Sequence, residues 1–175
     1  MCAVIVLLIC QRNSLSGCYY FDMNPDPKTQ ESLSFLGSHA VGVLATLSPT
    51  GEPHARTVYY VSNSALEVFF LTLSGTRKVE DINDNHRAAF VVSDEVVPKT
   101  LQIEGIISEL TDTAEIDTVV KKLMDIFTSK GEHFAPLAHL DSGRVLFYKL
   151  SPEWVRWGDF TKSEGTDEAF TDIHP

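Results

Sequence analysis

Cysteine is absent from most of the sequence. All three cysteines, Cys2, Cys10 and Cys18, fall near the N-terminus. From Met23 onward the chain therefore has no disulfide, no thiolate nucleophile and no cysteine-ligated metal. The sequence also lacks the glycine-rich motifs of dinucleotide-binding folds and phosphate loops, and the Gly-x-Ser-x-Gly turn of serine hydrolases. An enzyme with so little catalytic machinery of its own would need a bound cofactor for its chemistry.

Positive charge is scarce as well. The chain has 14 Lys and Arg against 24 Asp and Glu, a net charge of −10. This balance argues against nucleic acid and against an anionic membrane surface as partners. Any anionic ligand would have to be held by a local group of basic residues. The adjacent basic pair Arg77 and Lys78 is therefore more informative here than in a basic protein.

Long hydrophobic runs are also missing. The apolar run at residues 3–10 is too short to span a bilayer as a helix and lacks the basic start of a secretory signal. We expect residues 1–22 to be an extension outside the core of a cytoplasmic protein, with Met23 as the natural start. An alternative is a lipid anchor through Cys18, because residues 15–18 look like a lipoprotein cleavage box.

Apolar runs, some alternating with polar residues, predict six short strands. They span residues 41–47, 54–61, 66–73, 87–92, 100–110 and 145–150. Short turns join the first three, which favours antiparallel pairing. Pro152 should break the last strand and leave residues 154–157 as an edge piece.

Helical signals fall between and before the strands. Helices are expected to begin at Pro27, at Arg77 and just after Asp112, and the last carries an apolar stripe at helical spacing. Six antiparallel strands with helices as inserts predict a mainly β fold, a six-stranded antiparallel barrel. We expect this domain to span residues 23–160 and to be followed by an acidic tail at 161–175.

The turn after the third strand contains a local conflict. Arg77 and Lys78 occupy the first turn of a short helix, where the helix dipole favours acidic residues. An anion would resolve the conflict by neutralising both cations and accepting hydrogen bonds from the free N–H groups. Ser74 or Thr76 would cap the helix. This pattern indicates a phosphate site, and the alternative is a solvated basic pair beside the acidic residues of the same helix.

Several short segments, in this order and spacing, resemble the pyridoxamine 5'-phosphate oxidase-like flavoproteins. They are residues 43–46, 51–53, 54–60, 70–78, 85–89 and 101–105. The resemblance implies an FMN-binding split β-barrel and an oxidoreductase that passes hydride or electrons through flavin N5. It also implies a homodimer in which two protomers share each flavin at their interface.

The resemblance also assigns residues to the cofactor. Arg77 and Lys78 would hold the FMN phosphate, and Gln102 would bond the pyrimidine edge of the ring. A Trp, either Trp157 or Trp154, would cover the ring from the partner chain, unless Trp157 instead anchors the last strand in the core. The full implied set is Arg56, Thr57, Val58, Tyr59, Tyr60, Val61, Leu71, Thr72, Ser74, Thr76, Arg77, Lys78, Gln102 and Trp157, with residues 56–61 acting mostly through their backbone.

Two departures from the family pattern bear on the substrate. Val61 stands where the pyridoxamine-phosphate oxidases carry a lysine for the substrate phosphate, and nothing after Trp157 matches their C-terminal Arg-Leu-His-Asp-Arg segment. The small-molecule substrate or electron donor is thus not expected to be of the vitamin B6 type. The alternatives are a non-catalytic flavin-binding stress-type protein, or the same barrel with a deazaflavin or haem, for which His54 and His133 are candidate axial ligands.

Overall fold

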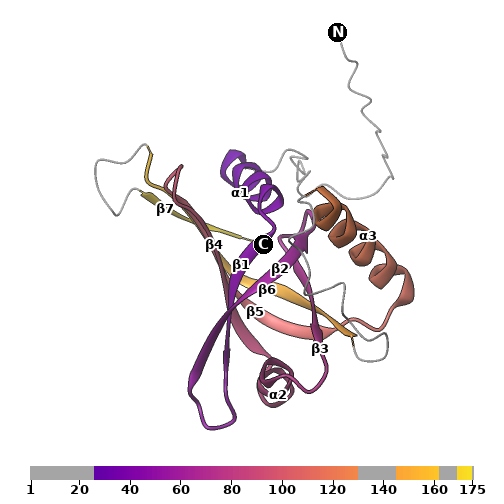
Figure 1. The fold of residues 1–175 in the computed structure, drawn as a ribbon. Helices are drawn as coiled ribbons and strands as arrows, with labels where there is room; N and C mark the ends of the chain where they lie inside the picture. The colour runs from indigo at the N-terminus through magenta and orange to yellow at the C-terminus, as the bar shows by residue number, and fades with distance from the viewer. Residues whose placement is uncertain (1–25, 130–144, 162–168, 175) are drawn as a thin grey trace, which may run out of the picture.

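Strand pairing closes the sheet of this protein into a barrel. The computed structural model describes residues 26–129, 145–161 and 169–174. The elements in these residues are α1 (Pro27–Ser38), β1 (Val41–Leu47), β2 (Pro53–Ser62), β3 (Val68–Leu73), α2 (Arg77–Asp84), β4 (Arg87–Asp94), β5 (Lys99–Glu109), α3 (Thr113–Ser129), β6 (Val145–Asp159) and β7 (Phe170–Ile173). The strands form one antiparallel sheet in the order β3-β2-β1-β4-β5-β6-β7, and β3 also pairs with β6 (Figure 1). The predicted six-stranded antiparallel barrel is confirmed.

The long strand β6 makes this closure possible. Its first six residues pair with β3, while β5 pairs with it along nearly its whole length. The predicted break at Pro152 is wrong, because a bulge accommodates the proline. Glu104 pairs with Trp154 and Gly105 with Pro152, so Glu153 is the extra residue. The strand therefore bends here and continues to Asp159.

The sheet continues beyond the predicted end of the domain at residue 160. Residues 170–173, which were expected to belong to an acidic tail, form β7 and pair with β6. Ile173 is buried in the core, and the side chains of Arg156 and Asp172 form an ion pair across the two strands, with Nε and Oδ1 2.7 Å apart. Of the other predicted tail residues the structure describes Thr161, Ala169 and His174, whereas residues 162–168 and 175, the N-terminal extension and His133 lie outside the described residues.

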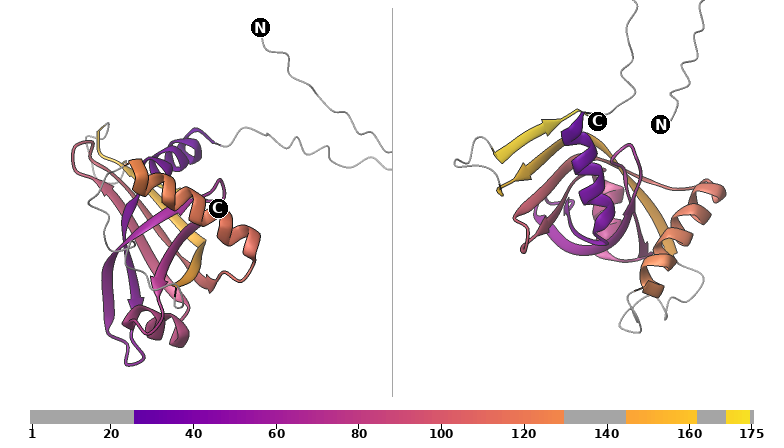
Figure 2. Two further views of the ribbon diagram at one scale, coloured as in Figure 1. Left: turned by 45° about the vertical axis from the view of Figure 1, so that its right-hand side comes forward. Right: turned by 90° about the horizontal axis from the view of Figure 1, so that it is seen from above.

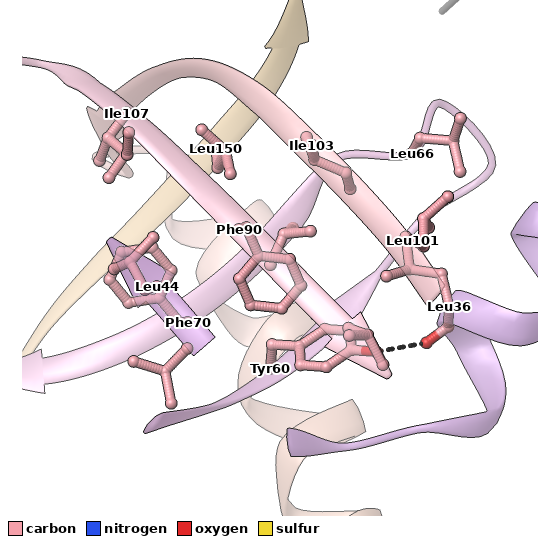
Figure 3. Packing of buried hydrophobic residues seen from close by; sticks show 14 of the residues in the cluster. Leu36, Leu44, Tyr60, Leu66, Phe70, Phe90, Leu101, Ile103, Ile107 and Leu150 are labelled. Atoms are coloured by element: carbon pink, nitrogen blue, oxygen red, sulfur yellow. Dashed lines mark hydrogen bonds between the residues drawn. The ribbon is translucent and has the colours of Figure 1, made fainter. Parts of the chain in front are cut away.

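Large apolar side chains fill the barrel. Those drawn in Figure 3 include Leu44, Tyr60, Phe70, Phe90, Ile103 and Leu150, all almost fully buried. Burying each side chain of this size contributes about 1.5–3 kcal/mol. The Tyr60 hydroxyl donates a hydrogen bond of 2.7 Å to the carbonyl of Leu36 in α1. This bond ties α1 to one end of the barrel.

The helices cover different parts of the barrel. α1 and α2 lie at opposite ends, and α3 lies along the outside (Figures 1 and 2). Asp26 caps α1 by accepting a hydrogen bond from the N–H of Lys28, as the predicted helix start requires. α3 buries Val119 and Leu123 against the outward face of β2 and β3. None of these helices is both long and apolar enough to cross a membrane within the described part of the chain.

Candidate functional site

A cleft of about 610 Å³ opens between β2, the end of β3 and the first turn of α2. β2 and β3 are paired only from Tyr60–Phe70 to Ser62–Val68 in the described chain, so the strands separate beyond that point. The residues that line the cleft are Pro53, His54, Ala55, Arg56, Thr57, Thr72, Thr76, Arg77 and Lys78. Two segments about twenty positions apart in sequence thus meet at one site, and the cleft contains six of the predicted site residues.

The start of α2 has no side-chain cap. Thr76 occupies the N-cap position, but its hydroxyl donates to the carbonyl of Leu73 at 3.0 Å and makes no cap hydrogen bond. Of the two predicted capping residues, Ser74 and Thr76, the second has the predicted position but does not make the capping hydrogen bond. Gly75 precedes it with a φ of +76°, a conformation that glycine adopts without strain. The first N–H groups of α2 are left available to a ligand.

Two cations stand at this uncapped end. Neither Arg77 nor Lys78 forms an ion pair with any of the described residues, and Arg77 is exposed. The Lys78 ammonium lies 5.7 Å from the centre of the Phe70 ring. Burial, together with the nearby charge of Arg56, lowers the pKa of Lys78 to about 8. A bound anion would favour the charged form of this lysine.

A third cation, Arg56, already has a partner. Asp81 of α2 is 1% exposed, and its Oδ2 accepts hydrogen bonds from Arg56 Nη2 at 2.8 Å, His54 Nδ1 at 2.9 Å and Thr46 Oγ1 at 2.7 Å. Burial opposes ionisation of Asp81, but these three bonds prevail and lower its pKa to about 2. The Arg56 Nη1 also donates to Thr46 at 2.8 Å. The carboxylate thus balances Arg56 and fixes its position.

Sequence reasoning missed this network. Asp81 entered only as one of the acidic residues beside the basic pair in the alternative interpretation, and His54 was assigned no role beside a phosphate. The available signal was the position of Asp81 in the helix, between the buried residues Val79 and Ile82. An acidic residue on the buried side of a helix needs partners, because an isolated buried charge is unstable.

The other predicted residues are not brought into the cleft. Val58, Tyr60 and Val61 are buried with their side chains away from it, and Leu71 packs toward α3, so at most their backbone groups could contribute. Tyr59 and Ser74 are not among the lining residues. Trp157 is fully buried in the core and packs edge-on against Phe35 with ring centres 5.0 Å apart. This packing matches the interpretation of Trp157 as a residue that anchors the last strand in the core.

Gln102 lies on the outward face of the sheet. Through successive strand pairs, Thr57 is next to Val43, Val43 next to Val91, and Val91 next to Gln102. Neighbouring strands are about 4.8 Å apart, so Gln102 is about 14 Å from Thr57. It therefore does not face the cleft of its own chain.

A family model described as pyridoxamine 5'-phosphate oxidase matches residues 29–157, a range that includes the whole cleft. The chain belongs to the pyridoxamine 5'-phosphate oxidase family. A search among curated proteins gives no match.

Solved structures of several different proteins have similar folds. A Clostridium acetobutylicum protein related to general stress protein 26 of B. subtilis has a TM-score of 0.62 and 17% identity, covering 83% of this chain and 93% of that one. A FAD-binding protein from Mesorhizobium loti has a TM-score of 0.56 and 23% identity, covering 72% and 90%. A haem-binding protein from Mycobacterium smegmatis has a TM-score of 0.67 and 16% identity, covering 87% and 60%. At these identities the likeness establishes the fold of the pyridoxamine 5'-phosphate oxidase family and no particular ligand.

Proposed function

We propose that this protein binds FMN through the cleft at the start of α2 and acts as a flavin-dependent oxidoreductase. The observation that carries the proposal is the uncapped helix end at which Arg77 and Lys78 have no ion-pair partner among the described residues. In a chain with a net charge of −10, two such cations beside free helix N–H groups favour a phosphate. Membership of the family and the FAD-binding relative support a flavin as the group that carries it.

The lining residues suit an FMN phosphate. The Arg77 guanidinium offers a bidentate fork and Lys78 a compact charge, and the hydroxyl of Thr72 can donate to a phosphate oxygen. The β2 backbone at residues 54–57 has no strand partner on the cleft side in the described chain, so its polar groups remain for the ribityl chain and ring edge. When bound, FMN supplies hydride and electron transfer at N5, and the protein binds and orients it.

We further propose that a second copy of the chain covers the outward face of β1. Val41, Val43 and Leu47 on this face are 38%, 43% and 38% exposed. The face is continuous with the cleft, because Val43 pairs with Thr57, which lines it. A copy docked here would enclose the flavin, and Gln102 would lie within the interface. Trp154, which is partly exposed, rather than Trp157, would then be the tryptophan able to reach a shared flavin.

The phosphate site can be tested with the double variant Arg77→Ala plus Lys78→Ala. Losing both charge-assisted contacts should weaken FMN binding by about 2–5 kcal/mol, or roughly 30- to 4,000-fold in the dissociation constant. Quenching of flavin fluorescence during titration measures this constant. The matched control is Lys121→Ala plus Lys122→Ala, which removes an adjacent exposed basic pair from α3 and should leave binding unchanged. An unaltered FMN affinity in the first variant would refute the assignment.

Oxidoreductase activity needs its own test. The purified protein should be yellow, and a reduced nicotinamide or another donor should bleach the flavin absorbance under anaerobic conditions. A flavin that stays oxidised with every donor tried would indicate a non-catalytic flavin-binding protein instead. The absorption spectrum of the released ligand distinguishes FMN from a deazaflavin or haem. A vitamin B6 substrate is not expected, because Val61 is buried toward α3 and supplies no cation.

A further inference from the structure

A histidine and a buried aspartate stand together at the edge of the phosphate cleft. The Nδ1 of His54 is 2.9 Å from Oδ2 of Asp81. An ionised carboxylate only accepts hydrogen bonds, so Nδ1 must carry the proton and donate it. The other ring nitrogen, Nε2, is then an acceptor when the imidazole is neutral and a donor when it is protonated. The ring is 24% exposed and lines the same cleft as Arg77 and Lys78.

The charges around His54 are nearly balanced before any ligand arrives. Asp81 offsets Arg56, with which it forms an ion pair of 2.8 Å. Glu52, in the turn before β2, is near enough that His54, after the hydrogen bonds from Ser48 and Thr50, helps to lower the pKa of its carboxyl. Besides these, the lining contains only the cations Arg77 and Lys78.

A phosphate monoester would change this balance. It carries a charge of about −1.5 to −2 at neutral pH, more than the excess positive charge that remains once Glu52 and Asp81 are counted. Imidazole is the ordinary side chain whose charge changes between pH 5 and 8. Protonation at Nε2 would add the missing charge and convert that nitrogen into a donor toward the ligand, while Asp81 stabilises the imidazolium through Nδ1.

We propose that His54 takes up a proton from solvent when a phosphate group enters the cleft, and that the His54–Asp81 pair thereby couples ligand affinity to pH. The inference rests on the proposed function for the identity of the ligand, but it requires only the phosphate. Asp81 is a positioning residue in this scheme, because it orients the ring and does not touch the ligand.

Titration calorimetry measures this proton directly. FMN is titrated into the full chain at pH 7.0 in several buffers of different ionisation enthalpy, none of them phosphate. The slope of the binding enthalpy against ionisation enthalpy gives the number of protons exchanged. A positive slope, which is a net uptake of protons on binding, is the expected result. The FMN phosphate itself can only release protons on binding to cations, which is the opposite sign.

Variants identify the group that accepts the proton. His54→Gln should remove most of the uptake at pH 7.0 and most of the loss of FMN affinity that we expect as the pH rises from 6.5 to 8, and Lys78 accounts for the remainder. The matched control is His86→Gln, which changes an exposed histidine between α2 and β4 and should keep both properties. Lys78→Arg distinguishes the contribution of Lys78 to the proton uptake from that of His54, because arginine keeps the charge and does not titrate in this range. Uptake at pH 7.0 should persist in that variant.

The possible results separate this inference from the proposed function. FMN binding without proton uptake, or with an uptake that His54→Gln leaves in place, would overturn the inference and leave flavin binding intact. If FMN does not bind, inorganic phosphate is titrated in the same way. Phosphate binding with an uptake that depends on His54 would then support the inference while the proposed function fails. Binding of neither probe would overturn both.

Discussion

At the scale of the residue, what a cation can do in the cleft depends on whether it already has a partner. Arg56 directs two guanidinium nitrogens to Asp81 and Thr46, whereas Arg77 and Lys78 have no such partner among the described residues. The role of Arg77 and Lys78 could be predicted from sequence, because their conflict with the helix dipole is local. The Arg56–Asp81 ion pair could not be predicted, because the two residues are 25 positions apart and meet only when α2 packs against the barrel.

The low pKa of Asp81 gives the folded protein a specific pH dependence. Because the folded pKa, about 2, lies below the ordinary value of 3.8, the contribution to stability is complete above pH 4 and is lost as the pH falls toward 2. The shift corresponds to about 2 kcal/mol of unfolding free energy. Asp81→Asn should lower stability at pH 7 by on the order of 3 kcal/mol, because it leaves Arg56 without its counter-charge.

Urea unfolding at pH 7, 4 and 2.5 checks this expectation. The difference between wild type and Asp81→Asn should narrow by about 1–1.5 kcal/mol from pH 4 to 2.5. Asp84→Asn serves as a control, since it removes an exposed carboxylate from the same helix and should have little effect. A constant difference across the three pH values would contradict the assigned role of Asp81.

At the scale of the element, sequence patterns predicted those strand and helix bounds that depend on interactions between neighbouring residues. β1 has the predicted bounds, and the Asp26–Pro27 start of α1 is confirmed, because strand alternation and helix capping depend on neighbouring residues. The continuity of β6 across Pro152 depends instead on a register shift in β5. β7 has four residues, too few for a periodic signal, and is held by its pairing with β6.

The bulge in β6 requires glycine at position 105 of β5. A Cβ there would lie 2.0 Å from the carbonyl oxygen of Ser151, a backbone atom that moves only with its strand. Gly105→Ala should therefore lower the free energy of unfolding by about 2–3 kcal/mol. Gly37→Ala in α1 has nothing within 4 Å of the added Cβ and should raise it by about 0.5–1 kcal/mol. Equal effects of the two substitutions in urea unfolding would be inconsistent with the observed packing.

At the scale of the whole molecule, one feature of the barrel creates the site. The sheet closes through β3 and β6, yet β2 and β3 pair over only three residue pairs, and the cleft opens where they separate. The family resemblance predicted this split barrel. It assigned Gln102 to the cofactor and left Trp157 either over the ring of a partner chain or in the core. Strand order puts Gln102 on the outer face, and Trp157 is buried in the core. Strand order across a sheet comes from long-range pairing, which no short motif encodes.

A substitution on the outer face of β1 tests the proposed dimer. Val43→Glu places a charge at the centre of this face, next to the Thr57 side of the cleft. It should raise the dimer dissociation constant by about 30-fold or more and weaken FMN retention, because each flavin would lose its cover. Val97→Glu is the matched control, since Val97 is also 43% exposed but lies in the β4–β5 turn.

Sedimentation analysis should show a particle of twice the 19.4 kDa chain mass for wild type and Val97→Glu, and a shift toward the single-chain mass for Val43→Glu. Flavin content after gel filtration, measured on the same samples, links assembly to the site. A Val43→Glu protein that remains dimeric would place the interface elsewhere. A monomeric Val43→Glu protein that keeps its FMN would show that one chain suffices to hold the flavin, and the exposed valines of β1 would then serve assembly alone.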